Sequence, residues 1–279
     1  MIKIRGRPHK VAPTFRGDIM DFEIIDFHTH PFDDLNTNIC NYRDHIPMDA
    51  DGAVKYLKGM GISKICGSVV SWEAYGKADF NSIKLRNNKA LELKEKYGDF
   101  YVPGFHIHPA FVKESLEEIE RMHKEGITLI GELVPYWDGW NDYSCREFSE
   151  ILDLADNYNM VVSFHTMTDD DQMDKMVKEH KNITFVAAHP GEKAKFLRHL
   201  ERMRISENYH LDLSGGGLFR QGLLRYGIDK CGVEKFIFGS DYPTCNPAMF
   251  IGGVLLDSLL TDKEKEIIFS ENAKRILKL

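Results

Sequence analysis

The stretch Ile24–Pro31 reads Ile-Ile-Asp-Phe-His-Thr-His-Pro and decides how the rest of the chain is interpreted. Its apolar, β-branched and aromatic residues are typical of a short buried strand, which the proline ends. Side chains two positions apart on a strand lie on the same side, so the rings of His28 and His30 can converge on one point. Two histidines placed in this way predict a metal ion at the end of the strand.

After this strand, the chain alternates between further strand-like runs and amphipathic stretches of helical length. Each run is almost continuously apolar, as in parallel strands that are buried on both faces. Eight strands alternating with helices in 279 residues predict an α/β fold, a single-domain (β/α)8 TIM barrel over residues 22–279, preceded by an N-terminal extension over residues 1–21. The predicted strands are Ile24–His28, Ile65–Val70, Tyr101–Ile107, Thr128–Val134, Val161–His165, Thr184–His189, His210–Leu213 and Lys235–Gly239.

Several of the helical stretches begin with a capping box. In this motif, a serine or threonine side chain and a glutamate three residues later satisfy free backbone N–H groups of the first turn. The boxes are Ser115–Glu118, Ser144–Glu147 and Thr261–Glu264. We expect a helix to begin at each of them.

The composition argues against several classes of partner. Charged residues make up 28% of the chain, and the net charge is -7 without a concentrated basic run. Nucleic acids and acidic membrane surfaces require such a run, so neither is expected as a partner. The chain has no apolar run of membrane-spanning length and its start lacks a secretory signal, so we expect a soluble, cytoplasmic protein. Five scattered cysteines without CxxC spacing argue against a disulfide framework.

Residues of the metal-binding type follow most of the predicted strands. In a (β/α)8 barrel, the carboxyl ends of the strands meet at one mouth, where the active site lies. Imidazole nitrogen and carboxylate oxygen suit divalent zinc first, with manganese or iron as alternatives. These residues are His28 and His30 from strand one, His106 and His108 from strand three, Glu132 from strand four, His165 from strand five, His189 from strand six and Asp241 from strand eight.

This ordered set of strand-end residues resembles that of the metal-dependent hydrolases of the amidohydrolase superfamily. The segments Gly104–Pro109, Gly239–Pro243 and Ser270–Leu277 look like the amidohydrolase-related branch (amidohydrolase 2), which includes aromatic-acid decarboxylases. The resemblance extends from Asp26 to the C-terminus. It implies a metal-dependent enzyme with its site at the mouth of the barrel.

The resemblance also implies roles for the individual ligands. His28, His30 and Asp241 would hold one metal, and the histidines of strands five and six would hold a second where there is one. In one-metal members, the strand-five histidine joins the first metal and the strand-six histidine contacts the bound water. Two-metal members need a bridging carboxylate, often a carboxylated lysine, whereas this chain offers Glu132. We expect either a pair of ions bridged by Glu132, which we favour, or a single ion.

Four further residues are candidates for contact with the substrate. One of His106 and His108 is expected to face the substrate or a metal ligand, with simple packing as the alternative. Trp137, in the aromatic loop Tyr136–Trp140, can stack on a ring substrate, or the loop can cover the barrel or a subunit interface. Arg220 can hold a substrate carboxylate through two hydrogen bonds.

The function expected first is hydrolysis of a carboxylic ester, lactone or amide. A metal lowers the pKa of its bound water to near neutrality, and Asp241 can carry the proton from that water to the leaving group. The alternative is a non-oxidative decarboxylase of an aromatic or unsaturated acid, which the ligands alone do not separate from a hydrolase. A third alternative is a metal-binding barrel without catalysis. We expect a small-molecule substrate, and a homodimer is compatible with the sequence.

Overall fold

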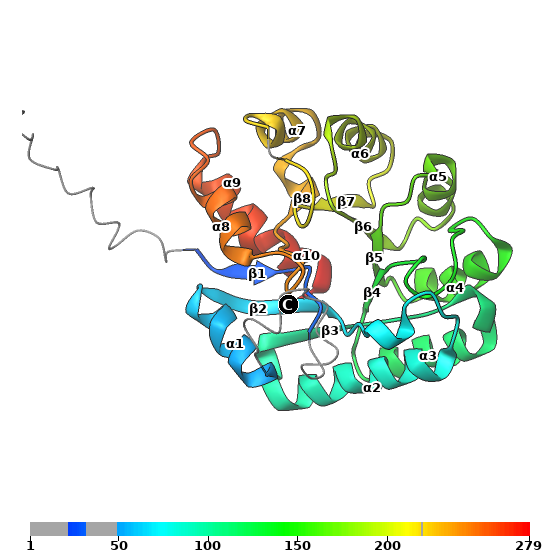
Figure 1. Ribbon diagram of the computed structural model, residues 1–279. Coiled ribbons are helices and arrows are strands. Elements are labelled where there is room, and N and C mark those ends of the chain that lie inside the picture. The colour runs from blue at the N-terminus through cyan, green and yellow to red at the C-terminus, as the bar shows by residue number, and fades with distance from the viewer. Residues whose placement is uncertain (1–21, 32–48, 219) are drawn as a thin grey trace, which may run out of the picture.

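The computed structural model describes residues 22–31, 49–218 and 220–279, so the predicted extension over residues 1–21 lies outside the described residues. Eight parallel strands follow one another in sequence order around a single sheet (Figure 1). The last strand meets the first, because Phe27 N donates to Phe238 O at 3.0 Å and Asp241 N donates to His28 O at 2.8 Å. The predicted (β/α)8 TIM barrel is therefore confirmed.

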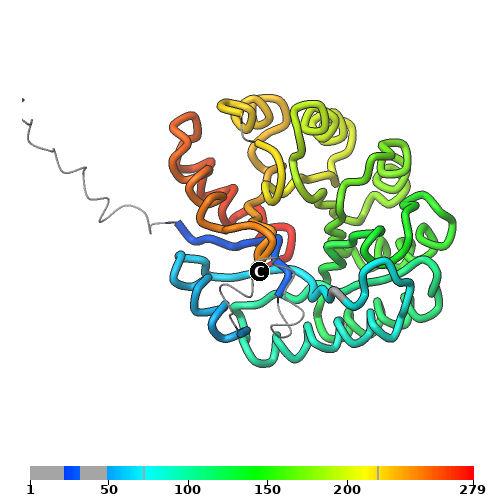
Figure 2. The backbone as a smooth tube through the Cα atoms, in the orientation of Figure 1, coloured from blue at the N-terminus to red at the C-terminus, as the bar shows by residue number. Residues whose placement is uncertain are grey.

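Helices alternate with the strands and lie around the outside of the barrel, as Figure 2 also shows. The strands are β1 (Ile24–Asp26), β2 (Ile62–Ser68), β3 (Tyr101–Phe105), β4 (Leu129–Leu133), β5 (Val161–His165), β6 (Thr184–Ala188), β7 (Tyr209–Asp212) and β8 (Phe236–Ile237). The helices are α1 (Ala50–Gly59), α2 (Phe80–Tyr97), α3 (Val112–Lys124), α4 (Arg146–Asn157), α5 (Asp170–Glu179), α6 (Lys193–Ile205), α7 (Leu223–Cys231), α8 (Pro247–Leu255), α9 (Asp262–Glu266) and α10 (Asn272–Leu277).

Only one of the three predicted capping boxes starts a helix. Thr261 accepts from Glu264 N and its own N–H donates to the Glu264 side chain, so α9 begins as predicted. Ser115 instead lies inside α3, which begins three residues earlier, and its hydroxyl bonds to the backbone of His108. Ser144 stands one residue before the N-cap of α4 and donates to Asp142 Oδ1 at 2.8 Å. These two predictions were wrong because the serines satisfy neighbouring loops rather than a helix start.

The barrel interior is filled with apolar side chains below the mouth. Ile25, Leu129, Val186 and Ile237 form a buried cluster that also includes residues of α10, such as Ala273. A larger cluster packs the outer faces of the strands against the surrounding helices. Because α10 covers the end of the interior cluster, the mouth at the carboxyl ends of the strands is left as the position for a ligand. Within the described part of the chain, none of the helices combines the length and apolarity needed to cross a membrane.

A buried histidine behind strand β7 makes a testable contribution to stability. Burial, assisted by the charge of Arg202, lowers the pKa of His199 to about 3, and its Nδ1 lies 2.7 Å from Tyr209 Oη. Since an unfolded histidine titrates near 6.5, the unfolded chain takes up a proton between about pH 6.5 and 3 that the folded chain does not. Stability from this residue is complete above that range and declines as the pH falls, by roughly 1.4 kcal/mol per pH unit.

We therefore expect the free energy of unfolding of His199→Gln to depend less steeply on pH than that of the wild type. Urea unfolding at a series of pH values from about 7 to 4.5 measures the slope. His123→Gln, at an exposed position, is the control and should keep the wild-type slope. Equal slopes for the wild type and His199→Gln would contradict the assignment.

Candidate metal centre

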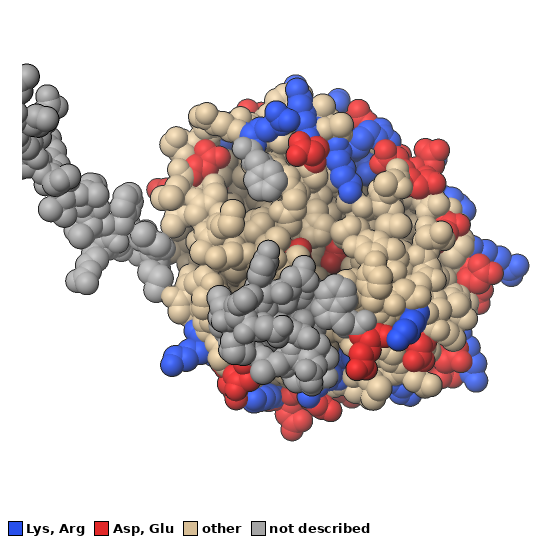
Figure 3. All heavy atoms as spheres, viewed as in Figure 1, with Lys and Arg blue, Asp and Glu red and all other residues tan. Residues whose placement is uncertain are grey.

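Six of the eight predicted strand-end residues meet at the mouth of the barrel. His28 and His30 lie just after β1, and Asp241 lies after β8, where the last strand closes on the first. The face viewed in Figure 3 is hollowed at the centre of the ring, with acidic atoms at the floor of the hollow. The remaining members are Glu132 in β4, His165 at the end of β5 and His189 directly after β6.

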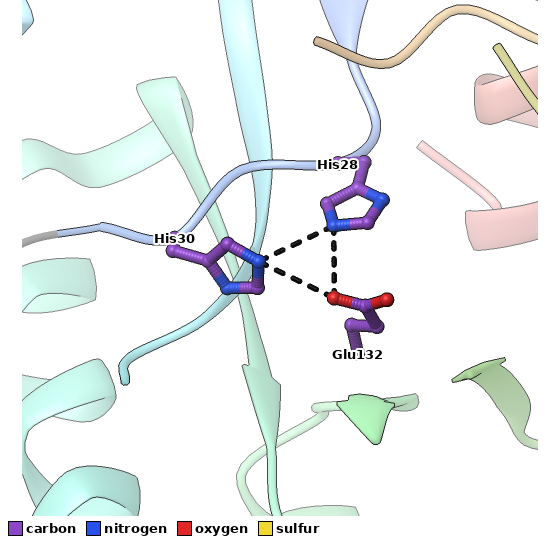
Figure 4. A group of neighbouring side chains, drawn as sticks. All are labelled: His28, His30 and Glu132. Carbon is purple, nitrogen blue, oxygen red and sulfur yellow. Dashed lines mark hydrogen bonds and ion pairs between the residues drawn. The ribbon is translucent and has the colours of Figure 1, made fainter. Parts of the chain in front are cut away.

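Four of these side chains surround one point. The Nε2 atoms of His28 and His30 are 3.3 Å apart, and Glu132 Oε2 lies 3.1 Å from the first and 3.3 Å from the second (Figure 4). Asp241 Oδ1 approaches the same two nitrogens at 3.7 Å and 3.4 Å. All four residues are less than 9% exposed, so the point that they surround is largely withdrawn from water.

The second oxygen of Glu132 faces a second pair of histidines. Glu132 Oε1 is 3.0 Å from His165 Nδ1 and 3.7 Å from His189 Nε2. One carboxylate therefore stands between two groups of potential ligands that share it, His28 and His30 on one side and His165 and His189 on the other. This geometry is compatible with a bridging carboxylate as well as with a single ion.

The spacing of these atoms fits a divalent metal. Ligands at about 2.1 Å from an ion stand roughly 3.0–3.4 Å from one another in octahedral or tetrahedral geometry. The separations among His28 Nε2, His30 Nε2 and Glu132 Oε2 fall between 3.1 Å and 3.3 Å. Nitrogen and carboxylate oxygen are the donors that zinc, manganese and iron(II) accept.

The electrostatics of the centre also favour a positive charge. Burial alone would lower the pKa of a histidine ring, but the charges of Glu132 and Asp212 raise the pKa of His28 well above its usual value. Against the same burial penalty, hydrogen bonds with Asp241 and Glu132 raise the pKa of His30 to about 9. The buried carboxylates thus stabilise positive charge between them. A bound metal supplies that charge in place of protons on the two histidine rings.

Two residues of the centre have an unusual backbone conformation. His189 has φ 68° and Asp241 has φ 62°, in the left-handed region that residues other than glycine rarely adopt. Such a conformation costs on the order of 1–3 kcal/mol and is found preferentially at functional sites. The surrounding structure holds both side chains toward the mouth in spite of this cost.

Sequence reasoning missed two buried residues at the end of β7. Asp212 Oδ2 lies 2.8 Å from His28 Nδ1, and Ser214 Oγ lies 3.1 Å from His189 Nδ1. Both residues are fully buried. Burial by itself would raise the pKa of Asp212, but the charge of His28 and the hydrogen bond with it keep that pKa below its usual value. The sequence does contain a signal for Asp212. It ends the apolar strand β7, just as the predicted metal ligands lie at the ends of other strands.

The two strand-three histidines lie outside the centre. His106 Nε2 lies 2.9 Å from Val69 O, and burial together with the charge of Arg86 lowers the pKa of His106 to about 4. His108 Nδ1 accepts from Ala110 N at 3.0 Å, and its Nε2 lies 2.9 Å from Asp138 O. Both ring nitrogens of His108 are thus occupied by backbone groups, which supports the packing alternative for that residue.

In the aromatic loop after β4, Tyr136 rather than the predicted Trp137 contacts a histidine of the centre. Tyr136 stands edge-on to His165, with ring centroids 5.4 Å apart, and is 45% exposed. Trp137 Nε1 donates to Ser71 O at 3.0 Å, which ties the loop to the segment after β2. Arg86 Nη2 also holds the loop, by donating to Asp138 Oδ1 at 2.6 Å.

Arg220, the predicted carboxylate clamp, lies on the surface. Its side chain is 66% exposed and its Nη2 atom is 3.6 Å from Glu192 Oε2. Such an exposed ion pair contributes little to stability, so the guanidinium can exchange this partner for another anion at small cost. Its contact with a substrate remains a prediction of the sequence.

From the geometry of the centre, we predict that the number of metal ions bound per chain depends on Glu132. We expect protein purified without chelator to contain bound divalent metal, and Glu132→Ala to contain much less, because the side chain contacts both groups of ligands. Elemental analysis measures the number of ions per chain. Glu118→Ala is the matched control, since Glu118 is equally buried but pairs with Arg121 and Asn87 rather than with the histidines of the centre. Undiminished metal in Glu132→Ala would contradict the geometry.

Comparisons with known proteins agree with this fold. A crystal structure of 2,6-dihydroxybenzoate decarboxylase from Rhizobium has 14% identity and a TM-score of 0.72, covering 92% of this chain and 99% of that one. A dihydroxybenzoic acid decarboxylase from Polaromonas sp. JS666, with bound manganese and the inhibitor 2-nitroresorcinol, has 14% identity and a TM-score of 0.68, covering 92% and 97%. A putative amidohydrolase from Staphylococcus aureus has 15% identity and a TM-score of 0.69, covering 92% and 100%.

At such identities, these similarities establish the fold alone. Among curated protein sequences, none matches the chain. The family model described as amidohydrolase, however, matches residues 25–279, which is nearly the whole chain and includes every residue of the candidate metal centre. This chain belongs to the amidohydrolase family.

Proposed function

We propose that this protein is a metal-dependent enzyme that releases carbon dioxide from a small aromatic carboxylic acid without an oxidant. The observation that carries the proposal is the buried centre of His28, His30, Glu132 and Asp241 at the mouth of the barrel. The same fold in decarboxylases of dihydroxybenzoic acids supports this reaction over the hydrolysis expected first from the sequence. The manganese in the Polaromonas structure supports manganese beside zinc as the metal.

The reaction requires a cation and a proton donor. When bound, a divalent metal supplies positive charge that holds and polarises oxygen atoms of the substrate and lowers the pKa of bound water. As the bond between the ring and the carboxylate carbon breaks, its electron pair stays on the ring carbon. That carbon takes up a proton, so that the aromatic carboxylate plus H⁺ gives the arene and carbon dioxide.

We assign the transfer of this proton to Asp241. Its Oδ1 faces His28 and His30, and Cys245 Sγ lies 4.0 Å from its Oδ2. The residue is 8% exposed, which leaves the carboxylate at the boundary between the centre and the hollow. A carboxyl group in this position can hold a proton on one oxygen and transfer it to a substrate carbon. Burial lowers the pKa of the neighbouring His189, which favours the neutral form of that ring.

Tyr136 offers an aromatic wall for a ring substrate. It lies edge-on to His165 and nearly half of its surface is exposed, so a planar ring in the hollow can pack against it. Such contacts favour an aromatic over an aliphatic acid.

A second candidate is hydrolysis of an ester, lactone or amide. The position of Glu132 favours it, because one oxygen faces His28 and His30 and the other faces His165. Two ions bridged by a carboxylate would suit attack by an activated water on a carbonyl carbon.

Product analysis distinguishes the two reactions. Protein loaded with manganese or zinc is incubated with 2,6-dihydroxybenzoate and related hydroxybenzoates, and separately with a panel of esters, lactones and amides. The proposal predicts carbon dioxide together with the phenol that lacks the carboxyl group. Hydrolysis products without carbon dioxide would replace the proposal with the second candidate, and inactivity on both panels would contradict both.

For Asp241→Asn, we expect turnover to fall by roughly 10²- to 10⁴-fold, because the amide cannot hold and transfer a proton. Metal content is measured on the same sample, since Asp241 also lies beside His28 and His30. Asp229→Asn, on the surface of α7, is the control and should remain active. Full turnover by a metal-loaded Asp241→Asn protein would exclude the proton-transfer role.

Removing the aromatic wall should weaken substrate binding more than it slows the chemical step. We expect Tyr136→Ala to raise KM for aromatic acids by about 2- to 10-fold, as expected from 0.5–1.5 kcal/mol for an aromatic contact. Tyr136→Phe keeps the ring and should stay near the wild-type KM. Steady-state kinetics of both variants provide the comparison, and an unchanged KM in Tyr136→Ala would show that the ring does not contact the substrate.

A further inference from the structure

Strand β7 ends in a buried pair of a carboxylate and a hydroxyl group that lies behind the metal centre. Asp212 and Ser214 are both fully buried. Asp212 Oδ1 accepts from Ser214 N at 2.9 Å and from Ser214 Oγ at 2.5 Å. The other carboxylate oxygen lies 2.8 Å from His28 Nδ1, and Ser214 Oγ lies 3.1 Å from His189 Nδ1. The pair therefore connects histidines that come from β1 and β6.

The direction of each hydrogen bond follows from what the groups can donate. An ionised carboxylate only accepts hydrogen bonds, so His28 Nδ1 donates to Asp212. The single hydroxyl hydrogen of Ser214 points to Asp212 Oδ1, which leaves Ser214 Oγ as an acceptor. His189 Nδ1 must then donate to Ser214 Oγ. In the neutral form that metal binding requires, an imidazole has one N–H, so with Nδ1 donating, the Nε2 atoms of both rings offer a lone pair to a metal.

Both of these lone pairs are directed to the same carboxylate. His28 Nε2 lies 3.1 Å from Glu132 Oε2, and His189 Nε2 lies 3.7 Å from Glu132 Oε1. The two rings are stacked, with centroids 5.2 Å apart. They thus present their lone pairs on the two sides of Glu132, as metal ligands require.

We propose that Asp212 is a positioning residue that sets the tautomer of two metal-binding histidines at once, His28 directly and His189 through the hydroxyl of Ser214. The proposal rests on the metal centre of the proposed function, but it holds for either reaction. Asp212 contacts the Nδ1 side of His28, whereas Glu132 faces its Nε2. Asp212 acts by holding the two rings in the one form that can bind metal.

Two glycines make room for this arrangement. A Cβ on Gly215, where φ is 61°, would overlap His189 Nδ1. A Cβ on Gly239 would lie 2.8 Å from His28 Cβ and 3.3 Å from Ser214 Cβ. The backbone after β7 therefore packs against the ring of His189, and the backbone after β8 packs against the Cβ atom of His28.

An amide in place of the carboxylate cannot support both histidines. If the new amide of Asp212→Asn turned its oxygen to His28, its N–H groups would face Ser214 and the serine hydroxyl would have to donate to His189 Nδ1. His189 would then carry its hydrogen on Nε2 and lose the lone pair. If the amide instead turned its N–H groups to His28, Nδ1 of His28 would have to accept, and the Nε2 lone pair of His28 would be lost. Ser214→Ala removes a hydroxyl that lies 3.0 Å from His28 Nδ1 and 3.1 Å from His189 Nδ1. His28 keeps its direct contact with Asp212, whereas the His189 ring loses its link to that carboxylate.

The test measures metal affinity and histidine tautomers in the full chain. Affinity for zinc is determined by competition with a chromogenic chelator for the wild type, Asp212→Asn and Ser214→Ala. Tautomers are determined from ¹⁵N chemical shifts of histidine-labelled, zinc-loaded protein, a signature that a general loss of stability does not produce. Glu118→Gln is the matched control, because it also changes a buried acid to its amide, at a side chain that pairs with Arg121 and Asn87 rather than with His28 or His189.

We expect Asp212→Asn to bind zinc about 10- to 100-fold more weakly, with one histidine changing from the Nδ1–H to the Nε2–H form. Ser214→Ala should weaken zinc binding by less than about 10-fold and free the tautomer of His189, while His28 keeps the Nδ1–H form through Asp212. Glu118→Gln should match the wild type. If Asp212→Asn fails to fold, Ser214→Ala still tests the relay through the hydroxyl.

Two results would overturn the proposal, and they are distinguishable from failure of the proposed function. Wild-type zinc affinity and unchanged histidine signals in both variants would remove the positioning role while leaving the metal centre and its chemistry intact. A wild-type protein that binds no zinc would remove the metal centre itself, and the positioning role with it.

Discussion

The structure of the mouth depends on the contacts of one buried carboxylate, that of Glu132. Its two oxygens face histidines from β1 on one side and from β5 and β6 on the other. His28 and other histidines around it keep the pKa of Glu132 well below its usual value, although burial acts in the opposite direction. Without a compensating cation, this charge would be costly in so enclosed a place. The need for positive charge is therefore built into the end of the barrel.

The barrel makes this concentration of charge possible. Parallel strands place their carboxyl ends at one mouth, and the apolar filling beneath them supports the polar groups from below. The backbone strain at His189 and Asp241 can persist because Gly215 packs against the His189 ring and the Asp241 N–H donates to His28 O. Around the mouth, the loop after β4 is fixed by Arg86 and Trp137, so that Tyr136 has a defined position beside the centre.

Asp212 illustrates how a group outside the centre can govern it. Its carboxylate does not face the point between His28, His30 and Glu132, yet it contacts one of the rings directly and another through Ser214. Replacing a strand-end ligand would remove a donor atom, whereas replacing Asp212 would change which nitrogen of a ring can act as donor. The chemistry proposed for the mouth therefore depends on strand β7, which supplies no predicted ligand.

The sequence by itself determined the fold and the residue types at the strand ends. Alternating apolar runs and helices specify a barrel, and the period of a strand places the last polar residues of each run at the same edge. Only the tertiary structure decided which of these residues meet. His106 and His108 have the same spacing as His28 and His30, but their rings bond to backbone groups of neighbouring loops. The contact between Asp212 and His28 joins residues 184 positions apart, so it depends on barrel closure and strand register, which no local sequence pattern contains.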